Sequence, residues 1–131
     1  MQFDAEIPFT YAITAYGAEG IAIQGQWYRQ GVIVGADGLV LPWPVQLQNE
    51  QFTAADLSLV LQHTAHPHAK PYELVIVGTG KRQIFLPPDL LRPFIESGLP
   101  VECMNTPAAC RTYNIVAAEG RRVLAALYPG V

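Results

Sequence analysis

Charged residues are scarce in this sequence, at 15% of 131 residues, whereas half of the residues are hydrophobic. This composition excludes a disordered chain and supplies enough apolar side chains for a buried core. The formal net charge of −3 excludes broad nucleic-acid binding, which needs a basic face. The length is typical of one domain, so we expect residues 1–131 to form a single domain.

Cysteines are few, and long apolar runs are missing. Cys103 and Cys110 are too few for a disulfide framework in so small a chain, so we expect both to be reduced thiols. The first residues lack the positive and apolar regions of a signal peptide. No apolar run is long enough to span a bilayer. We therefore expect a cytoplasmic protein without a membrane span.

The first half of the chain contains two hairpin signals. Strand-like residues 11–16 and 20–24 flank one turn with glycines, and residues 30–34 and 39–41 flank another. Each pair predicts two antiparallel strands.

Proline and a helix start follow the second hairpin signal. Pro42 predicts an end to regular strand pairing, because proline cannot donate to a ladder. Trp43 between prolines suits either an exposed anchor for a partner or a core position, and we favour the core because large aromatics are usually well buried. Thr53 and Asp56 resemble a capping box, which predicts a helix from Thr53 with an apolar face at residues 57–61.

The second half alternates strands and helices. Residues 74–77 form a short apolar run typical of a strand buried on both faces, and residues 99–103 predict another strand. The helix between them is expected to end at residue 97, with Pro93 in its first turn.

The last segment predicts the longest helix. Thr106 is a suitable N-cap and Pro107 a suitable first residue. The expected buried stripe consists of Tyr113, Val116, Ala117, Gly120, Leu124 and Leu127.

A strand, a helix and a second strand in this order predict a right-handed crossover with parallel strands. Hairpins precede that unit in the chain. The predicted fold class is therefore α/β, with three layers, a central mixed sheet with helices on its faces, and an N-terminal hairpin region.

Parallel strands would bring two polar loops to one edge of the sheet, where ligands usually bind in open α/β sheets. Unpaired N–H groups at the start of the last helix would favour anions, and Lys81, Arg82 and Arg111 would add positive charge. The edge therefore suits an anion or an acidic partner segment, but a tight turn with solvated charges explains the same residues. The candidate binding residues are Gly78, Thr79, Gly80, Lys81, Arg82, Thr106, Cys110, Arg111, Thr112, Tyr113 and Asn114.

The glycines of this edge do not form a nucleotide-binding motif. A P-loop needs a glycine where Val75 stands and a serine or threonine where Arg82 stands. A dinucleotide fingerprint needs a third glycine at Gln83. We therefore expect no cofactor.

Cys110 and the three histidines are the remaining reactive groups. A helix start beside Arg111 would lower the pKa of the Cys110 thiol, but a small buried thiol packed on the sheet is the favoured interpretation. His63, His66 and His68 lie within six residues without a cysteine nearby, so a polar loop is favoured over a zinc site. We assign no catalytic residue and no metal ligand.

Several segments together resemble a known family. They are residues 41–44, 78–80, 87–88, 106–114 and 118–121. The chain, from residue 13 to residue 127, resembles a small domain-of-unknown-function family. Its bacterial and archaeal members stand alone, and its mitochondrial member is NADH:ubiquinone oxidoreductase (complex I) assembly factor 3.

The resemblance implies a three-layer fold with a central mixed sheet and no established enzymatic activity. It also implies function through protein contacts, because the mitochondrial member works with a partner assembly factor and early complex I subunits. The absence of a transit-peptide pattern fits a bacterial member.

Three functions remain open. The resemblance favours a protein-interaction or assembly factor. The alternatives are an anion- or small-ligand-binding module at the edge formed by residues 78–82 and 106–114, and an enzyme of unknown reaction that uses Cys110 or Tyr113. We expect an unidentified protein partner and no nucleic acid, and an edge strand near the first hairpin leaves room for a homodimer.

Overall fold

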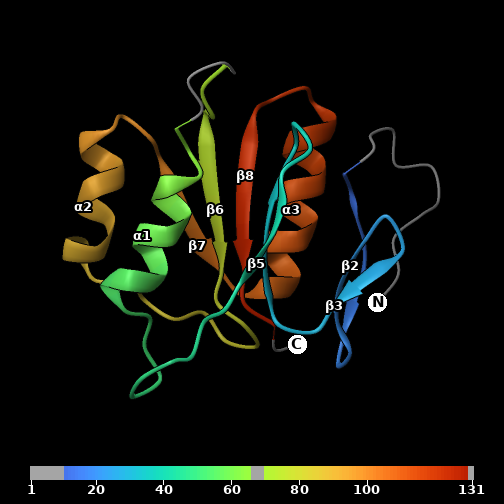
Figure 1. The fold of residues 1–131 in the computed structure, drawn as a ribbon, viewed down its shortest axis with the longest axis horizontal. Coiled ribbons are helices and arrows are strands. Elements are labelled where there is room, and N and C mark those ends of the chain that lie inside the picture. Colours follow the sequence, from blue (N-terminus) through green and yellow to red (C-terminus); the bar gives the residue numbers. More distant parts are fainter. Residues whose placement is uncertain (1–10, 66–69, 130–131) are drawn as a thin grey trace.

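A five-stranded mixed sheet forms the centre of the structure (Figure 1). The computed structural model describes residues 11–65 and 70–129. The strands of the central sheet are β4 (Gly31–Gly35), β5 (Val40–Trp43), β6 (Leu74–Gly78), β7 (Val101–Met104) and β8 (Val123–Leu127). They lie in the order β5-β4-β8-β6-β7. β6 is parallel to β7 and β8, whereas β4 is antiparallel to β5 and β8.

Helices cover both faces of this sheet. Helices α1 (Ala54–Gln62) and α2 (Pro88–Glu96) lie on one face, and α3 (Thr106–Ala118) lies on the other (Figure 1). Alternate residues of β6 divide accordingly: Val75 and Val77 pack in the core under α1 and α2, whereas Leu74 and Ile76 pack in the core under α3. The predicted fold class is confirmed.

A small second sheet lies against α3. It consists of β1 (Ile13–Gly17), β2 (Gly20–Ile23) and β3 (Gln26–Tyr28), in that order. The Asn114 side chain joins it to α3, because Oδ1 accepts from the Ile13 N–H (2.9 Å) and Nδ2 donates to the Ile13 carbonyl (2.8 Å). Asn114 thus provides a hydrogen-bond partner for both the N–H and the carbonyl of the buried residue Ile13.

Several local predictions are confirmed. Both hairpins form, and β6 and β7 are parallel. Thr53 and Asp56 form a capping box, with the Thr53 N–H donating to Asp56 Oδ2 (2.8 Å). Trp43 is fully buried, donates to the Asp56 carbonyl (3.0 Å) and stacks on Phe52. The third strand of the small sheet, β3, was not predicted.

The prediction of one helix up to residue 127 is wrong. Helix α3 ends at Ala118, Gly120 turns the chain with a φ of 85°, and β8 then runs between β4 and β6. All five residues of β8 are buried, and such a continuous apolar run cannot be distinguished from a buried helix by its period. The N-cap is Asn105 rather than Thr106, since Asn105 Oδ1 accepts from the Ala108 N–H (2.9 Å).

Two proline predictions are also wrong. β5 continues through Pro42, because β5 is an edge strand and its outer side needs no N–H donor. Pro93 lies in the middle of α2 rather than in its first turn, because the helix begins at Pro88. Pro93 is exposed, and its missing N–H removes one bond from α2.

None of the helices within the described residues is long and apolar enough to cross a membrane.

We predict that Asn114→Ala destabilises the protein by about 1–3 kcal/mol, because the N–H and carbonyl of Ile13 lose their buried partner. Urea unfolding measures the loss, and hydrogen exchange at the Ile13 amide should accelerate. Ile115→Ala, on an exposed side chain of the same helix, is the matched control. Equal stability of Asn114→Ala and the wild type would contradict the anchoring role.

Candidate functional site

The loop after β6 and the start of α3 meet, as the sequence predicts. The Thr79 N–H donates to the Met104 carbonyl (2.9 Å), and the Thr106 N–H donates to the Gly80 carbonyl (2.8 Å). The Gly80 N–H in turn donates to Thr106 Oγ1 (2.8 Å). These bonds place the carboxyl ends of β6 and β7 beside the first turn of α3.

Two buried threonines, Thr79 and Thr106, form hydrogen bonds with the backbone in and around the loop after β6. Thr79 Oγ1 donates to the Arg82 carbonyl (2.7 Å) and accepts from the Ile84 N–H (3.0 Å). Thr106 Oγ1 donates to the Tyr128 carbonyl (2.6 Å). The polar groups of both side chains are therefore satisfied inside the protein, and the loop has a defined shape.

The space at the end of β6 favours glycine. A Cβ at Gly78 would lie 3.0 Å from Thr106 Oγ1 and 3.0 Å from the Leu127 side chain, which is tighter than ordinary contact. Gly80 has a φ of 98°, in the left-handed region that favours glycine. The glycines serve close packing of the loop against α3 and β8.

Lys81 and Arg82 line a surface depression of about 480 Å³, which we call the edge depression. A second wall of the depression is the turn between β5 and α1, which contributes Leu47 and Glu50 to the lining. Asn49 and Glu50 in this turn have φ values of 51° and 61°. Asn49 is a weak turn signal in the sequence, but no local pattern indicates that this turn meets the loop after β6. The lining residues are Leu47, Glu50, Thr79, Lys81, Arg82, Gln83, Ile84, Tyr128 and Pro129.

The candidate residues on α3 contact the small sheet or the core instead. The Arg111 side chain donates to the Tyr16 hydroxyl (2.9 Å), and the Tyr113 hydroxyl donates to the Tyr11 carbonyl (3.0 Å). Asn114 binds the backbone of Ile13, and Thr112 is half-buried. The structure thus brings Lys81 and Arg82 together and directs Arg111 toward β1.

The backbone donors at the start of α3 already have acceptors. The N–H groups of Thr106, Ala108 and Ala109 donate to Gly80, to the Asn105 side chain and to the Asn105 carbonyl. The expected supply of unpaired N–H groups for an anion is therefore wrong. The first turn of α3 therefore offers no free N–H group at Thr106, Ala108 or Ala109 to an anion.

Cys110 is fully buried, which confirms the favoured interpretation of a small thiol packed on the sheet. Burial raises the pKa of the Cys110 thiol to about 12, although Arg111 acts in the opposite direction. Burial, together with Glu102, raises the pKa of the half-buried Cys103 thiol to about 11. Tyr113 is also fully buried, and burial followed by Asp37 raises the pKa of its hydroxyl. These groups are poorly placed for catalysis.

His63 forms the C-cap of α1, and the other two histidines of the predicted polar loop, His66 and His68, lie outside the described residues. Within residues 11–65 and 70–129, no three His, Cys, Asp or Glu side chains gather to hold a metal ion.

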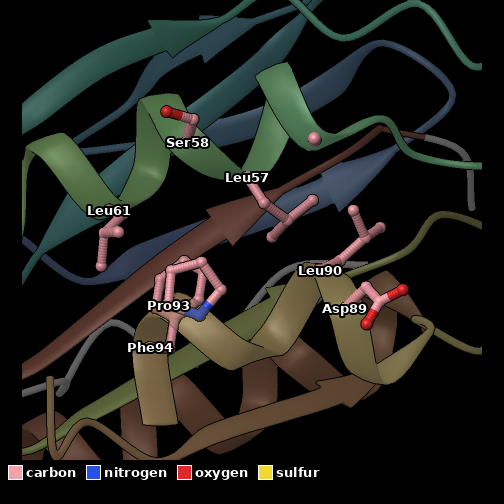
Figure 2. Close-up of a pocket in the computed structure, with 8 residues that line it drawn as sticks. Leu57, Ser58, Leu61, Asp89, Leu90, Pro93 and Phe94 are labelled. Atoms are coloured by element: carbon pink, nitrogen blue, oxygen red, sulfur yellow. The ribbon is translucent and has the colours of Figure 1, made fainter. Parts of the chain in front are cut away.

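A second depression, of about 180 Å³, lies between α1 and α2 and was not predicted. Leu57 and Leu61 of α1 point toward α2 (Figure 2). Leu90 and Phe94 of α2 point back toward α1 (Figure 2). The apolar residues of each helix indicate a buried face. The sequence does not show that the faces of α1 and α2 meet each other.

We predict that iodoacetamide at pH 8 leaves Cys110 unmodified in the folded protein and modifies it in urea, because only the unfolded chain exposes the thiol. Peptide mass spectrometry distinguishes Cys110 from Cys103, whose partial exposure permits slow labelling. Rapid labelling of native Cys110 would refute the structural role.

We also predict a dependence of stability on alkaline pH. The folded pKa of Cys110, about 12, lies above its ordinary value of 9.0, so its contribution is complete below pH 9. The contribution is lost as the pH rises toward 12, at about 1.4 kcal/mol per pH unit for one proton. Urea unfolding should show a shallower loss for Cys110→Ala than for the wild type, and parallel curves would contradict the raised pKa.

Comparison with known proteins identifies relatives of the whole chain. The chain is 33% identical over 95% of its length to a Mus musculus protein named NADH dehydrogenase (ubiquinone) 1 alpha subcomplex assembly factor 3, of which it covers 64%. A crystal structure from Bordetella parapertussis has a TM-score of 0.78 and 39% identity, and the match covers 92% of this chain and 97% of that chain. The solution structure of a Bordetella pertussis Mth938-like domain has a TM-score of 0.73 and 34% identity, with 98% and 90% covered.

The family resemblance inferred from the sequence motifs is confirmed. The chain spans less than two thirds of the mouse relative, so that relative contains additional sequence. The model of one protein family matches residues 13–128, which include both sheets and all three helices described above. The chain therefore belongs to the family described as Protein of unknown function (DUF498/DUF598).

Proposed function

We propose that this chain is a protein-binding assembly factor that assists the assembly of a multisubunit NADH dehydrogenase. The observation that supports the proposal is the similarity to the mouse assembly factor, which extends over nearly the whole of this chain. Because the chain spans only part of that factor, its partners and its place in assembly belong to the proposal. We also propose that the protein is located in the cytoplasm.

The geometry of the chain favours contacts over turnover. The side chains of Cys110 and Tyr113, which were the candidate reactive groups, are buried between α3 and the central sheet. Large apolar side chains are exposed and available for contacts with a partner: Phe85 is 85% exposed, Ile95 69% and Ile115 63%.

Deletion of the gene in the source cell tests the proposal. We expect less fully assembled NADH dehydrogenase on native gels and an accumulation of partial assemblies, with recovery when the wild-type gene is restored. Succinate dehydrogenase is the control, because a general respiratory defect would reduce both enzymes. Unchanged amounts and subunit composition of NADH dehydrogenase in the deletion strain would refute the proposed function.

A second candidate function is the binding of a small anion at the edge formed by residues 78–82. The observation that favours it is the pair of exposed cations, Lys81 and Arg82, on one side of the edge depression. Titration with inorganic phosphate, followed by amide chemical shifts, should move the signals of Lys81 and Arg82. An unchanged spectrum at millimolar phosphate would eliminate this candidate.

A further inference from the structure

We infer that the edge depression binds an acidic segment of the partner protein that also contains apolar side chains. This inference rests on the proposed function, since it states the chemistry by which a partner would be recognised. It assigns a role to the wall at residues 47–50, which lies outside the edge predicted from the sequence.

Charge is the first reason. Lys81 and Arg82 are exposed, and neither takes part in the ion pairs of the described residues. Glu50 is the acidic residue among those that line the depression. Two cations against one carboxylate make this spot positive on a chain whose net charge is −3, so the complementary surface is negative.

The apolar part of the lining is the second reason. Leu47, Ile84 and Tyr128 are half-buried and form part of the same depression. Tyr128 is held in place by edge-on packing against the buried Phe52, with ring centroids 5.8 Å apart. An inorganic anion would leave this surface in water, whereas an apolar side chain beside the carboxylates would cover it.

The rigidity of both walls is the third reason. Thr79 fixes the loop that contains Lys81 and Arg82 through its bonds to the backbone of Arg82 and Ile84. The turn between β5 and α1 is closed by reciprocal backbone bonds of 3.0 Å between Gln48 and Gln51. Walls that are ordered before binding reduce the entropy lost when a segment docks.

Size limits the occupant to a short segment. A volume of about 480 Å³ is in the range of small-molecule sites, so the edge depression accepts a few side chains rather than a folded domain.

The depression between α1 and α2 gives no comparable indication of its occupant, because Asp89 in its lining already pairs with Arg92 (3.0 Å).

Fluorescence anisotropy with a labelled peptide tests the inference. The probe is an extended peptide in which two glutamates precede a phenylalanine and a leucine. One matched peptide replaces the glutamates by glutamines, and another replaces the two apolar residues by alanines. Binding of the probe, with at least about tenfold weaker binding of both matched peptides, is the expected result for joint recognition of charge and apolar surface.

Variants of the chain locate the binding site. Lys81→Glu with Arg82→Glu should weaken binding of the probe at least about tenfold, and Leu47→Ala should weaken it about threefold. Glu50→Gln should tighten binding about threefold, because it removes the one carboxylate of the lining. The control is Arg29→Glu with Lys70→Glu, which changes the net charge equally at exposed residues outside the lining. Unchanged thermal unfolding of each variant confirms that the fold is intact.

Several results would overturn the inference. Equal weakening by the control pair would mean that the probe responds only to net charge. Competition by inorganic phosphate, together with no effect of Leu47→Ala, would mean a small-anion site. Binding to phosphatidylglycerol vesicles that depends on Lys81 and Arg82, without binding of the peptide, would mean a membrane surface.

The deletion strain separates this inference from the proposed function. Restoration of NADH dehydrogenase by the wild type and the control pair, but not by Lys81→Glu with Arg82→Glu, supports both. Full restoration by that double variant overturns the docking site and leaves the proposed function standing. If deletion has no effect on assembly, the proposed function fails, and the docking inference fails with it because the partner class is wrong.

Discussion

The structure depends on the burial of β6 and β8 on both faces. All five residues of each strand are buried, and the two strands lie side by side in parallel at the centre of the sheet. Strands of this kind need an apolar layer on each side. Helices α1 and α2 supply one layer, and α3 with the small sheet supplies the other.

The same arrangement determines where polar chemistry reaches the surface. β6 and β7 end at one edge, and the hydroxyl of Thr106 links the loop after β6 to the end of β8 through Gly80 and Tyr128. The N–H groups of Thr79, Gly80 and Thr106 bond within the protein, so they contribute to the shape of the loop. This edge exposes the charges of Lys81 and Arg82 to solvent.

Helix α3 acts as a scaffold between two sheets. Its buried side packs on the central sheet, and Arg111, Tyr113 and Asn114 bond to residues in or next to β1. A helix used in this way has little surface left for catalysis, and its thiol lies in the core. Cys110 and Tyr113 thus serve the packing of α3 on the central sheet.

Local sequence determined the elements whose signals lie within a few residues. Glycines marked the turns of both hairpins, Thr53 and Asp56 capped α1, and the apolar run at residues 74–77 gave a buried strand. The meeting of the Thr79 loop with Thr106 also followed, because a crossover between parallel strands brings their ends to one edge.

Only the tertiary structure decided the role of residues 123–127 and the composition of the site. That segment is a strand because it forms backbone hydrogen bonds with β4 on one side and β6 on the other. The local pattern of apolar residues does not reveal these partners. Likewise, Arg111 turns to Tyr16, and Leu47 joins Lys81 and Arg82. The physical reason is that these contacts join segments far apart in the chain, so they are set by how the layers pack rather than by the propensity of any single segment.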